Sequence, residues 1–355
     1  MQNYDVVVIG GGPAGCSTAI NCASLGMDVL LLEKGPRGRR KPCGGVLPWI
    51  TSEVIEDIIG EEMPPHIYDS PSELGLYYVP PSGRKNSGIV SNYRIHNIVR
   101  ERFDEWLLSV AIDSGVEVIT ETRFTNLSLE THNKVSAIRG DEVIEVSSDY
   151  IVGADGVRSQ IRRIIEPESF APVLLVAQEL WSGWKKSDIE DCFYGFFRGD
   201  ISISYSYIIP KGGNLLIGSG VQQKKSPNLI EGLRLFKTWL KEEFNFQEET
   251  LVSKEVWGIP FGYTILGHGD VVLVGDAAGL CNPLSGEGIR LGIESGESAA
   301  VAISRSKKGS NLIDAFQQEV EGLVGMVQRI FNFVLSLDDA GRERFVQEEL
   351  SRGII

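Results

Sequence analysis

Residues 4–34, YDVVVIGGGPAGCSTAINCASLGMDVLLLEK, decide the fold of this chain. Their pattern predicts a buried strand at 6–9, then a glycine-rich turn, then a helix whose alanines and Leu25 face inward. A second buried strand is predicted at 29–32. A strand, a glycine turn, a helix and a second, parallel strand form the βαβ unit on which dinucleotide-binding domains are built.

The turn and the end of the second strand carry the residues with which such a unit binds a nucleotide. Gly10, Gly12 and Gly15 follow the spacing G-x-G-x-x-G, which lets the backbone approach a pyrophosphate at the positively polarised start of the helix. Glu33, at the end of the second strand, is expected to accept hydrogen bonds from ribose hydroxyls. Its negative charge would repel a 2′-phosphate, so NADP is disfavoured at this position. NAD and FAD both remain open.

Two segments far along the chain favour FAD. Residues 150–163 place Asp155 after a strand and before a basic helix, and residues 270–300 place Asp276 after another strand. In the second segment, backbone N–H groups at 288–289 can face the negative charge that develops on a reduced flavin. Each acidic residue taken alone is explained as well by capping of a helix. Three such elements in one chain are poorly explained by capping.

Composition sets limits on function. The chain has 355 residues and a net charge of -14, which argues against nucleic acid as a partner because phosphates attract basic surfaces. Its five cysteines are scattered, as is typical of reduced thiols in a cytoplasmic protein. No apolar run approaches the ~20 residues of a membrane span, and we expect no signal peptide. The four histidines lack metal-ligand spacing, so no metal site is expected.

A lone cysteine lies in a glycine-rich loop at residues 39–45, RRKPCGG. Pro42 and the pair Gly44 and Gly45 are turn residues, so this loop can bring backbone close to a ligand while Cys43 presents a thiol. The cations before it belong to a dense basic run. We expect some of them to contact the pyrophosphate of the cofactor or an anionic lipid head group; a solvated loop is the alternative.

Together these motifs resemble the FAD-dependent hydroxylase superfamily and, within it, the geranylgeranyl reductase family. The segment KPCGG, residues 41–45, is similar to the cysteine loop that the reductases carry beside the flavin. The segment IVRERFDEWL is similar to the family's R-x-x-F-D-x-x-L helix, in which the first arginine, here Arg100, contacts FAD. Related aromatic hydroxylases share the other motifs but do not resemble this chain at the cysteine loop.

The resemblance implies a role for individual residues. The implied cofactor-binding residues are Gly10, Gly12, Pro13, Ala14, Gly15, Glu33, Lys34, Cys43, Gly44, Arg100, Asp155, Asp276, Pro283, Gly286, Gly288 and Ile289. The implied catalytic residues are Cys43, Gly44 and Tyr205, and the implied substrate-binding residues are Gly45, Tyr205, Tyr207, Ile209 and Pro210. Reduced FAD would supply a hydride from N5, and the Cys43 thiol would deliver a proton or hold the olefin. The alternative is that Cys43 only fills space beside the ring.

The chain departs from the family in the substrate region. The reductases carry a motif P-x-x-Y-x-W-x-F-P, which aligns with SISYSYIIP in this chain. Tyr205 and Pro210 are retained, whereas Ser202, Tyr207 and Ile209 replace proline, tryptophan and phenylalanine. Two large aromatic surfaces thus become smaller or more polar, so the pocket is expected to differ in shape.

The cofactor motifs fall in three blocks along the chain. The expected fold is therefore α/β, with a discontinuous Rossmann-like FAD-binding domain of parallel sheet and β-meander, an antiparallel-sheet substrate domain and C-terminal helices. The expected ranges are 1–75, 93–165 and 258–305 for the FAD-binding domain, 76–92 and 166–257 for the substrate-binding domain, and 306–355 for the C-terminal helical segment.

The leading hypothesis is an FAD-dependent, geranylgeranyl reductase-like oxidoreductase that reduces carbon–carbon double bonds of an isoprenoid or prenyl-lipid substrate. An FAD-dependent aromatic monooxygenase and a flavin electron carrier are the alternatives. No second nucleotide fold is visible in the sequence, so NAD(P)H or a ferredoxin is expected to donate electrons transiently. The expected location is the cytoplasm, with peripheral contact to a membrane as one way to reach the lipid.

Overall fold

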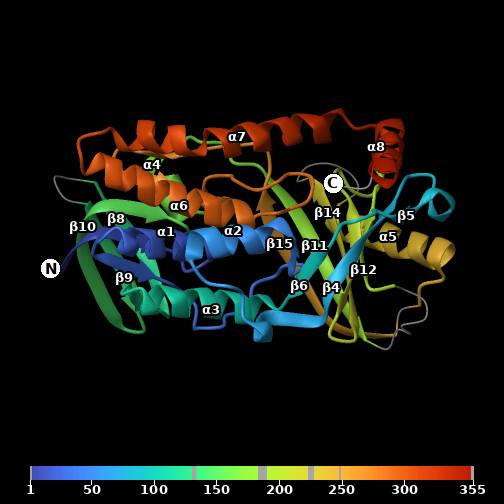
Figure 1. The fold of residues 1–355 in the computed structure, drawn as a ribbon, viewed down its shortest axis with the longest axis horizontal. Coiled ribbons are helices and arrows are strands. Elements are labelled where there is room, and N and C mark those ends of the chain that lie inside the picture. The colour runs from blue at the N-terminus through green and yellow to red at the C-terminus, as the bar shows by residue number, and fades with distance from the viewer. Residues whose placement is uncertain (1, 130–132, 183–189, 223–227, 248, 353–355) are drawn as a thin grey trace.

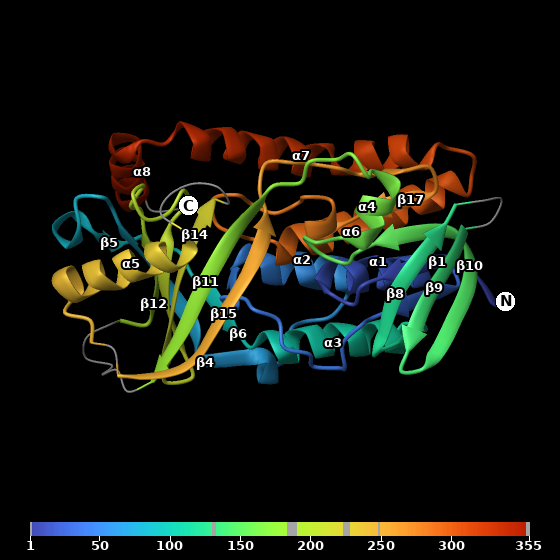
Figure 2. The ribbon, with the colours of Figure 1, turned by 180° about the vertical axis from the view of Figure 1, so that it is seen from behind.

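Two β-sheets lie at opposite ends of an elongated molecule. Helices run lengthwise between the two ends (Figure 1). The computed structural model describes residues 2–129, 133–182, 190–222, 228–247 and 249–352. Figure 2 shows the reverse side, where the strands of both sheets are exposed to view.

The first sheet has eight strands in the order β16-β17-β10-β1-β2-β7, and β9 and β8 continue antiparallel from β10. Its strands are β1 (Gln2–Ile9), β2 (Val29–Leu32), β7 (Glu117–Ile119), β8 (Thr122–Ser128), β9 (Asn133–Arg139), β10 (Glu142–Gly153), β16 (Gly267–His268) and β17 (Val271–Leu273). The central pairs β1–β2, β1–β10 and β10–β17 are parallel. The predicted parallel sheet with a β-meander is thus confirmed.

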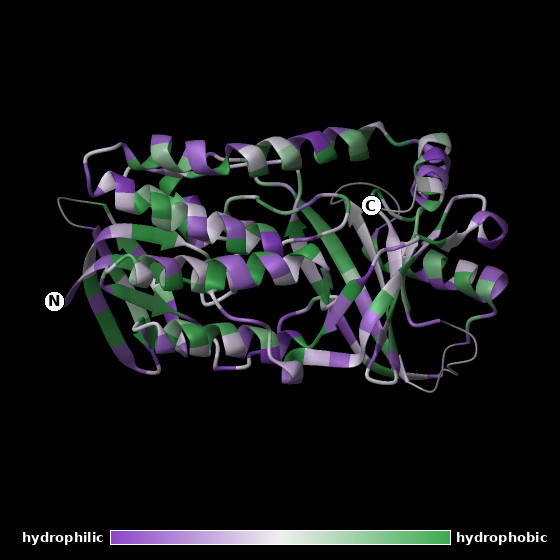
Figure 3. Ribbon diagram, viewed as in Figure 1, coloured by the Kyte–Doolittle hydropathy of each residue, from purple (hydrophilic) through white to green (hydrophobic). Residues whose placement is uncertain are grey.

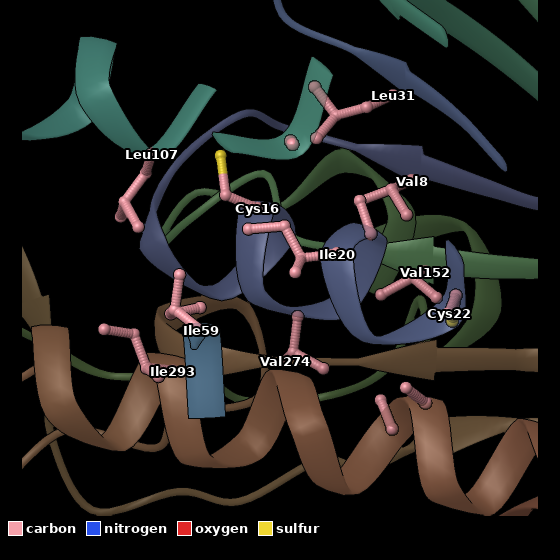
Figure 4. Packing of buried hydrophobic residues seen from close by; sticks show 14 of the residues in the cluster. Val8, Cys16, Ile20, Cys22, Leu31, Ile59, Leu107, Val152, Val274 and Ile293 are labelled. Carbon is pink, nitrogen blue, oxygen red and sulfur yellow. The ribbon is translucent and has the colours of Figure 1, made fainter. Parts of the chain in front are cut away.

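Alternate residues of β1 face two different cores. Val6 and Val8 pack among the helices, whereas Val7 and Ile9 pack against the meander. Figure 4 shows Val8 beside Ile20 of α1 in the helical core. The helices of this layer are α1 (Pro13–Ser24), α2 (Ile50–Ile59), α3 (Arg100–Asp113) and α6 (Ile289–Ser306). The resulting order is helices, parallel sheet, then meander.

The inward orientation expected for Leu25 was wrong. This side chain is 51% exposed, because α1 ends at Ser24 and the chain turns through Gly26, which has a φ of +80°. Leu25 therefore lies beyond the last turn whose periodicity predicted its position.

The second sheet has nine strands in the order β15-β11-β14-β13-β12-β4-β6-β3, with β5 on β4. Its strands are β3 (Val46–Pro48), β4 (Tyr68–Val79), β5 (Gly88–Ile89), β6 (Ile95–Ile98), β11 (Val173–Ser182), β12 (Cys192–Phe196), β13 (Ser206–Lys211), β14 (Asn214–Gln222) and β15 (Thr250–Pro260). It is antiparallel as expected, apart from the parallel pair β12–β4. β3, β6 and most of β4 lie in ranges expected for the FAD-binding domain yet pair within this sheet, and the domain boundaries stay a prediction.

The C-terminal helices are α7 (Leu312–Ser336) and α8 (Asp339–Arg352), while α4 (Gln160–Ile165) follows β10 and α5 (Leu229–Phe244) covers one face of the second sheet. α7 reaches both cores, because Phe316 belongs to the helical core of the first sheet and Val334 packs with Leu174 and Phe261. In Figure 3 green alternates with purple and white along the strands, whereas α8 is largely purple, as expected for a surface helix. No helix in the described ranges is long and apolar enough to cross a membrane.

Phe316→Ala tests the contribution of α7 to the first core. Phe316 is fully buried, so its loss should reduce the free energy of unfolding by about 3–5 kcal/mol. Leu335→Ala, on the same helix at a position that is 50% exposed, should change it by less than about 1 kcal/mol. Urea unfolding followed by circular dichroism measures both, and equal effects would contradict the packing of α7 described here.

Lys211, at the end of β13, is a buried cation in the second sheet. Its Nζ atom donates to the carbonyl oxygens of Gly45, at 3.0 Å, and Ile98, at 2.9 Å. The Asp69 carboxylate is 3.9 Å away, too far for a strong ion pair. Removal from water lowers the pKa of Lys211 to about 8, although Asp69 opposes this shift. The unfolded chain therefore binds a proton at this residue over a pH range in which the folded protein does not.

Stability should consequently rise with pH in the range governed by Lys211. Between pH 8 and the ordinary lysine pKa of about 10.4, the unfolded state binds more protons than the folded state, so deprotonation favours folding. The unfolding free energy should increase from pH 7.5 to pH 10 by on the order of 2 kcal/mol more in wild type than in Lys211→Met. The same pH dependence in both proteins would show that Lys211 is not buried as a cation.

Candidate functional site

The turn between β1 and α1 is closed so tightly that two of its glycines cannot carry a side chain. Gly10 has a φ of +112°, and a Cβ there would lie 2.4 Å from the carbonyl oxygen of Ala154. A Cβ on Gly15 would lie 1.9 Å from the carbonyl oxygen of Gly10. Gly12 is the N-cap of α1, and no side chain caps the helix there. The helix therefore presents an uncapped, positively polarised end beside this turn.

A second backbone segment meets this turn. Ala14, in the first turn of α1, contacts the backbone of α6, where a Cβ on Gly292 would lie 3.4 Å from the Ala14 Cβ atom. A Cβ on Gly275 would lie 2.9 Å from the same atom. Pro13 is buried beside them. The predicted residues of the first and last cofactor motifs thus lie together, although some 260 residues separate them in the chain.

Glu33 is buried at the end of β2 and already makes three interactions. Its two carboxylate oxygens accept hydrogen bonds from the backbone N–H groups of Gly11 and Gly35, each at 2.8 Å. The Arg39 Nε atom lies 2.9 Å from Oε1, and Arg39 also reaches Asp104 at 3.2 Å. Oε2 accepts only the Gly11 bond among the interactions described, which leaves room for a further donor. Lys34, the next residue, is exposed.

Asp155 combines a structural role with an unused oxygen. Its Oδ2 atom caps α4 by accepting from the N–H groups of Gln160, at 2.6 Å, and Ile161, at 3.3 Å. The helix cap considered from the sequence is therefore correct for this oxygen. Oδ1 is buried and has no hydrogen-bond partner among the described residues. A buried acceptor of this kind is costly unless a ligand or water donates to it.

Asp276 lies in a one-turn helix, Gly275–Ala277, directly before the loop that leads to α6. A Cβ on Gly288, the N-cap of α6, would be 3.0 Å from Asp276 Oδ1, so the carboxylate lies against the start of that helix. Burial raises the pKa of Asp276, and the positive charges of Lys41 and Arg100 oppose the shift. Ile289, the first residue of α6, is buried.

The loop between Asp276 and α6 is held by Asn282, which the sequence interpretation missed. Its Oδ1 atom accepts from the N–H groups of Leu284, at 3.0 Å, and Ser285, at 3.2 Å, and its carbonyl accepts from Gly286 at 2.8 Å. Pro283 is buried within this loop. An asparagine before a Pro-x-x-Gly stretch is a turn signal that could have identified it.

The cysteine loop lies against the face of the second sheet that carries Ile209 of β13 and Gln178 of β11. Cys43 is partly exposed, and the other four cysteines are buried. A Cβ on Gly44 would be 2.9 Å from the Ile209 Cδ1 atom, and Gly45 accepts from Lys211 as described above. The Gln178 Nε2 atom lies 3.5 Å from the Cys43 carbonyl oxygen. Strands that follow the loop by more than a hundred residues thus contact each of its last three residues.

Arg100 lies near both the Cys43 sulfur and the Asp276 carboxylate. It is buried at the start of α3 and binds Asp104 through several hydrogen bonds of 2.9–3.1 Å. Burial disfavours the cation, but Asp104 and the sulfur of Cys43 raise the pKa of Arg100. The guanidinium therefore stays charged beside the thiol. The basic run is engaged as well, since Arg40 pairs with Glu255 at 2.6 Å.

The predicted substrate residues Tyr205, Tyr207 and Ile209 alternate along or beside β13, so they share the face that meets the cysteine loop. The Tyr205 hydroxyl donates to the Ser285 carbonyl oxygen at 2.8 Å, and the Tyr207 hydroxyl donates to Gln178 Oε1 at 3.0 Å. Burial raises the pKa of both tyrosines well above the usual value, so both stay protonated. Pro210 points away from this row and is buried.

These features fit FAD on structural grounds alone. The glycine turn and the uncapped start of α1 suit a pyrophosphate, Glu33 and the free oxygen of Asp155 suit hydroxyl donors, and the start of α6 suits a flavin edge. Within the described ranges, no group of three or more His, Cys, Asp or Glu side chains is placed to hold a metal ion.

Comparison with known proteins agrees with this geometry. A model of the FAD binding domain matches residues 3–178. Geranylgeranyl diphosphate reductase of Rhodobacter capsulatus is 31% identical over 97% of this chain and 88% of its own length. Digeranylgeranylglycerophospholipid reductase 2 of Methanococcoides burtonii is 28% identical over 89% of this chain and 79% of its own length.

Solved structures show the same fold. A geranylgeranyl bacteriochlorophyll reductase-like protein from Thermoplasma acidophilum superposes with a TM-score of 0.84 and 21% identity, covering all of this chain and 93% of its own. The flavin-dependent halogenase CmlS superposes with a TM-score of 0.71 at 21% identity, covering 97% of this chain and 68% of its own. The extent and identity of the match to the Rhodobacter enzyme place this chain in the geranylgeranyl reductase family of FAD-dependent oxidoreductases.

Proposed function

We propose that this protein reduces carbon–carbon double bonds in the isoprenoid chain of a geranylgeranyl-type substrate. The observation that carries the proposal is the position of the cysteine loop. On one side it lies near Arg100, which also lies near Asp276, and on the other it contacts Ile209 of β13 and Gln178 of β11. Relatives named as geranylgeranyl reductases support the same conclusion.

FAD, when bound and reduced, supplies the hydride. The residues that we assign to it are the Gly10, Gly12 and Gly15 turn with Pro13 and Ala14, Glu33 with Lys34, Cys43 with Gly44, Arg100, Asp155, Asp276, and the segment Pro283, Gly286, Gly288 and Ile289. Arg100 and the start of α6 would offer positive charge and N–H dipoles to the negative charge that a reduced flavin carries.

Cys43 is assigned as the proton donor. Saturation of an alkene adds a hydride to one carbon and a proton to the other, so the site needs an acid beside the carbon that does not receive the hydride. Cys43 is the partly exposed thiol of the chain, and its sulfur accepts the Gly45 N–H at 3.3 Å. That bond leaves the S–H free to point away from the loop, and solvent replaces the proton afterwards.

The row Tyr205, Tyr207 and Ile209, with Gly45 and Pro210, is assigned to the substrate. Phe193 extends the row, since its ring stacks on Tyr207 at 6.1 Å between centroids and meets Tyr205 edge-on at 5.8 Å. These side chains offer apolar and aromatic surface to an isoprenoid, while the two hydroxyls are already bonded to protein. The substrate chain therefore meets few unpaired polar groups.

Electrons are proposed to come from a transient donor, NAD(P)H or a ferredoxin, because the cofactor motifs of this chain account for one nucleotide only. Peripheral contact with a membrane is proposed as the route by which a prenyl lipid enters, with the protein itself in the cytoplasm. We propose the domain boundaries that the sequence predicts, in which the FAD-binding domain is made of separate segments of the chain.

Glu33→Ala should weaken FAD binding. The change removes a carboxylate that accepts from ribose and from Gly11 and Gly35, and a hydrogen bond to a charged acceptor contributes about 1.5–3 kcal/mol. The dissociation constant, measured by quenching of flavin fluorescence, should rise at least about tenfold. Glu117→Ala, at the start of β7, is the control and should leave binding unchanged. Protein that purifies without FAD and cannot be reconstituted with it would contradict the cofactor assignment.

Cys43→Ala should abolish olefin reduction while FAD binding and reduction by dithionite remain. Loss of a general acid lowers the rate of the chemical step by ~10²-fold or more. The measurement is the anaerobic reoxidation of the dithionite-reduced protein by a geranylgeranyl substrate, with the saturated product identified by mass spectrometry. Cys22→Ala, a buried cysteine in α1, is the control.

Full activity in Cys43→Ala would show that Cys43 only fills space in the loop and does not donate the proton. If instead the wild-type protein consumed oxygen and hydroxylated an aromatic compound without saturating an isoprenoid, the monooxygenase alternative would replace the proposed function.

A further inference from the structure

Lys211 holds the residue whose backbone N–H group donates to the Cys43 sulfur. The Gly45 N–H group donates to Cys43 Sγ at 3.3 Å, while the Gly45 carbonyl accepts from the Ile98 N–H at 2.8 Å and from Lys211 Nζ at 3.0 Å. Lys211 also donates to the Ile98 carbonyl at 2.9 Å, so it bridges the loop and the end of β6. The Cys43 sulfur, which also interacts with Arg100, therefore accepts a hydrogen bond from a residue that Lys211 holds in place.

Steric contact restricts Gly45 further. Its φ is +61°, and a Cβ would lie 2.4 Å from the Ile98 carbonyl oxygen and 2.6 Å from Lys211 Nζ. The loop is therefore wedged between β6 and the lysine amine, and the amine fills the space that any other residue at position 45 would need. Without the amine, that space opens on the side of the loop that faces β13.

The Lys211 amine bonds to two carbonyls and has no close carboxylate among the described residues. Asp69 lies 3.9 Å away, while Cys43, Glu101 and Arg100 face the amine from the loop and from α3. By contrast, Lys237 and Lys254 both pair closely with Glu179, at 2.8 and 3.2 Å. A buried amine without a close carboxylate is costly in stability, and such a residue is more often retained for a role at a site.

We propose that Lys211 is the positioning residue of the Cys43 thiol, acting through Gly45. Its consequence for catalysis rests on the proposed function, whereas its effect on the loop does not. Because Lys211 acts through another residue, its removal should alter the order of the loop first and the rate of the chemical step as a result.

The first test is hydrogen–deuterium exchange in the FAD-bound protein at pH 7, with peptides that cover residues 43–46 resolved by mass spectrometry. Lys211→Met should exchange faster in this segment by about threefold or more, because the carbonyl of Gly45 loses a donor and local opening becomes easier. Lys254→Met, on the same sheet, should exchange there as wild type does. Exchange in Lys211→Met as slow as in wild type would overturn the proposal.

The second test is the kinetics of isoprenoid reduction. Displacement of a catalytic group by ~1 Å can cost ~10²-fold, so Lys211→Met should lose kcat by at least about tenfold while KM changes by less than about threefold. Faster exchange of the loop with an unchanged kcat would also overturn the positioning role. If wild type itself reduces no isoprenoid, the proposed function fails and the exchange result alone decides the role of Lys211.

A measurement on the native lysine covers the case in which Lys211→Met does not fold. In protein labelled with ¹⁵N-lysine, the Nζ–H resonance of Lys211, assigned by its nuclear Overhauser contacts with Gly45 and Ile98, should shift when Cys43 is changed to alanine, because Lys211 and Cys43 both bond to Gly45. The resonance of Lys254 should stay in place. A Lys211 resonance that does not respond to Cys43→Ala would show that the two side chains are not coupled and would overturn the proposal.

Discussion

The contact between α1 and α6 is the constraint on which the rest of the structure depends. A Cβ on Gly296 would lie 2.5 Å from the Ala14 carbonyl oxygen, and a Cβ on Gly292 would already touch Ala14. Only small residues allow two helices to approach this closely, and the approach brings the start of α6 beside the glycine turn of α1. Asp276 and Gly288 can then face the same space as Gly10 and Gly12. The cofactor site is therefore a consequence of backbone packing before any side chain acts in it.

Much of the first sheet could be predicted because its signals are local. The buried runs of β1 and β2, the glycine turn and the stop at Gly26 lie within 31 consecutive residues, and the meander alternates polar and apolar residues. The membership of β3, β4 and β6 in the second sheet could not be predicted in the same way. Their partners are distant in sequence, as in the parallel pairing of Cys192 with Gly75, and no local pattern specifies such a register.

The candidate site divides along the same line. Glycines and acidic residues at a fixed spacing from a strand can be recognised in the sequence, because turn geometry requires them at those positions. Lys211, Gln178 and Glu255 have no such sequence signal, since Lys211 and Gln178 contact the cysteine loop, and Glu255 contacts Arg40, only when three strands of the second sheet (β13, β11 and β15) pack beside it. One weak signal existed: Lys211 stands two residues after Ile209, so the strand places a charge on its apolar face. A cation at such a position is costly unless it has partners, and that cost points to a role.

The departure at Tyr207 shows how the second sheet accommodates a polar group where relatives are expected to carry tryptophan. A buried hydroxyl without a partner would destabilise this region, but the Tyr207 hydroxyl donates to Gln178, whose amide in turn donates to Glu255 at 2.8 Å. Glu255 pairs with Arg40, which precedes the cysteine loop, and the Gln178 amide nitrogen also lies near the Cys43 carbonyl. The Tyr207 hydroxyl thus joins a network that reaches Arg40 and the carbonyl of Cys43. Tyr207 therefore couples the face of β13 that carries Tyr205 and Ile209 to the loop that carries the thiol. Because Lys211 holds the same loop at Gly45, the second sheet holds the loop at both ends, and the loop's position depends on the packing of that sheet as well as on the glycine that position 45 requires.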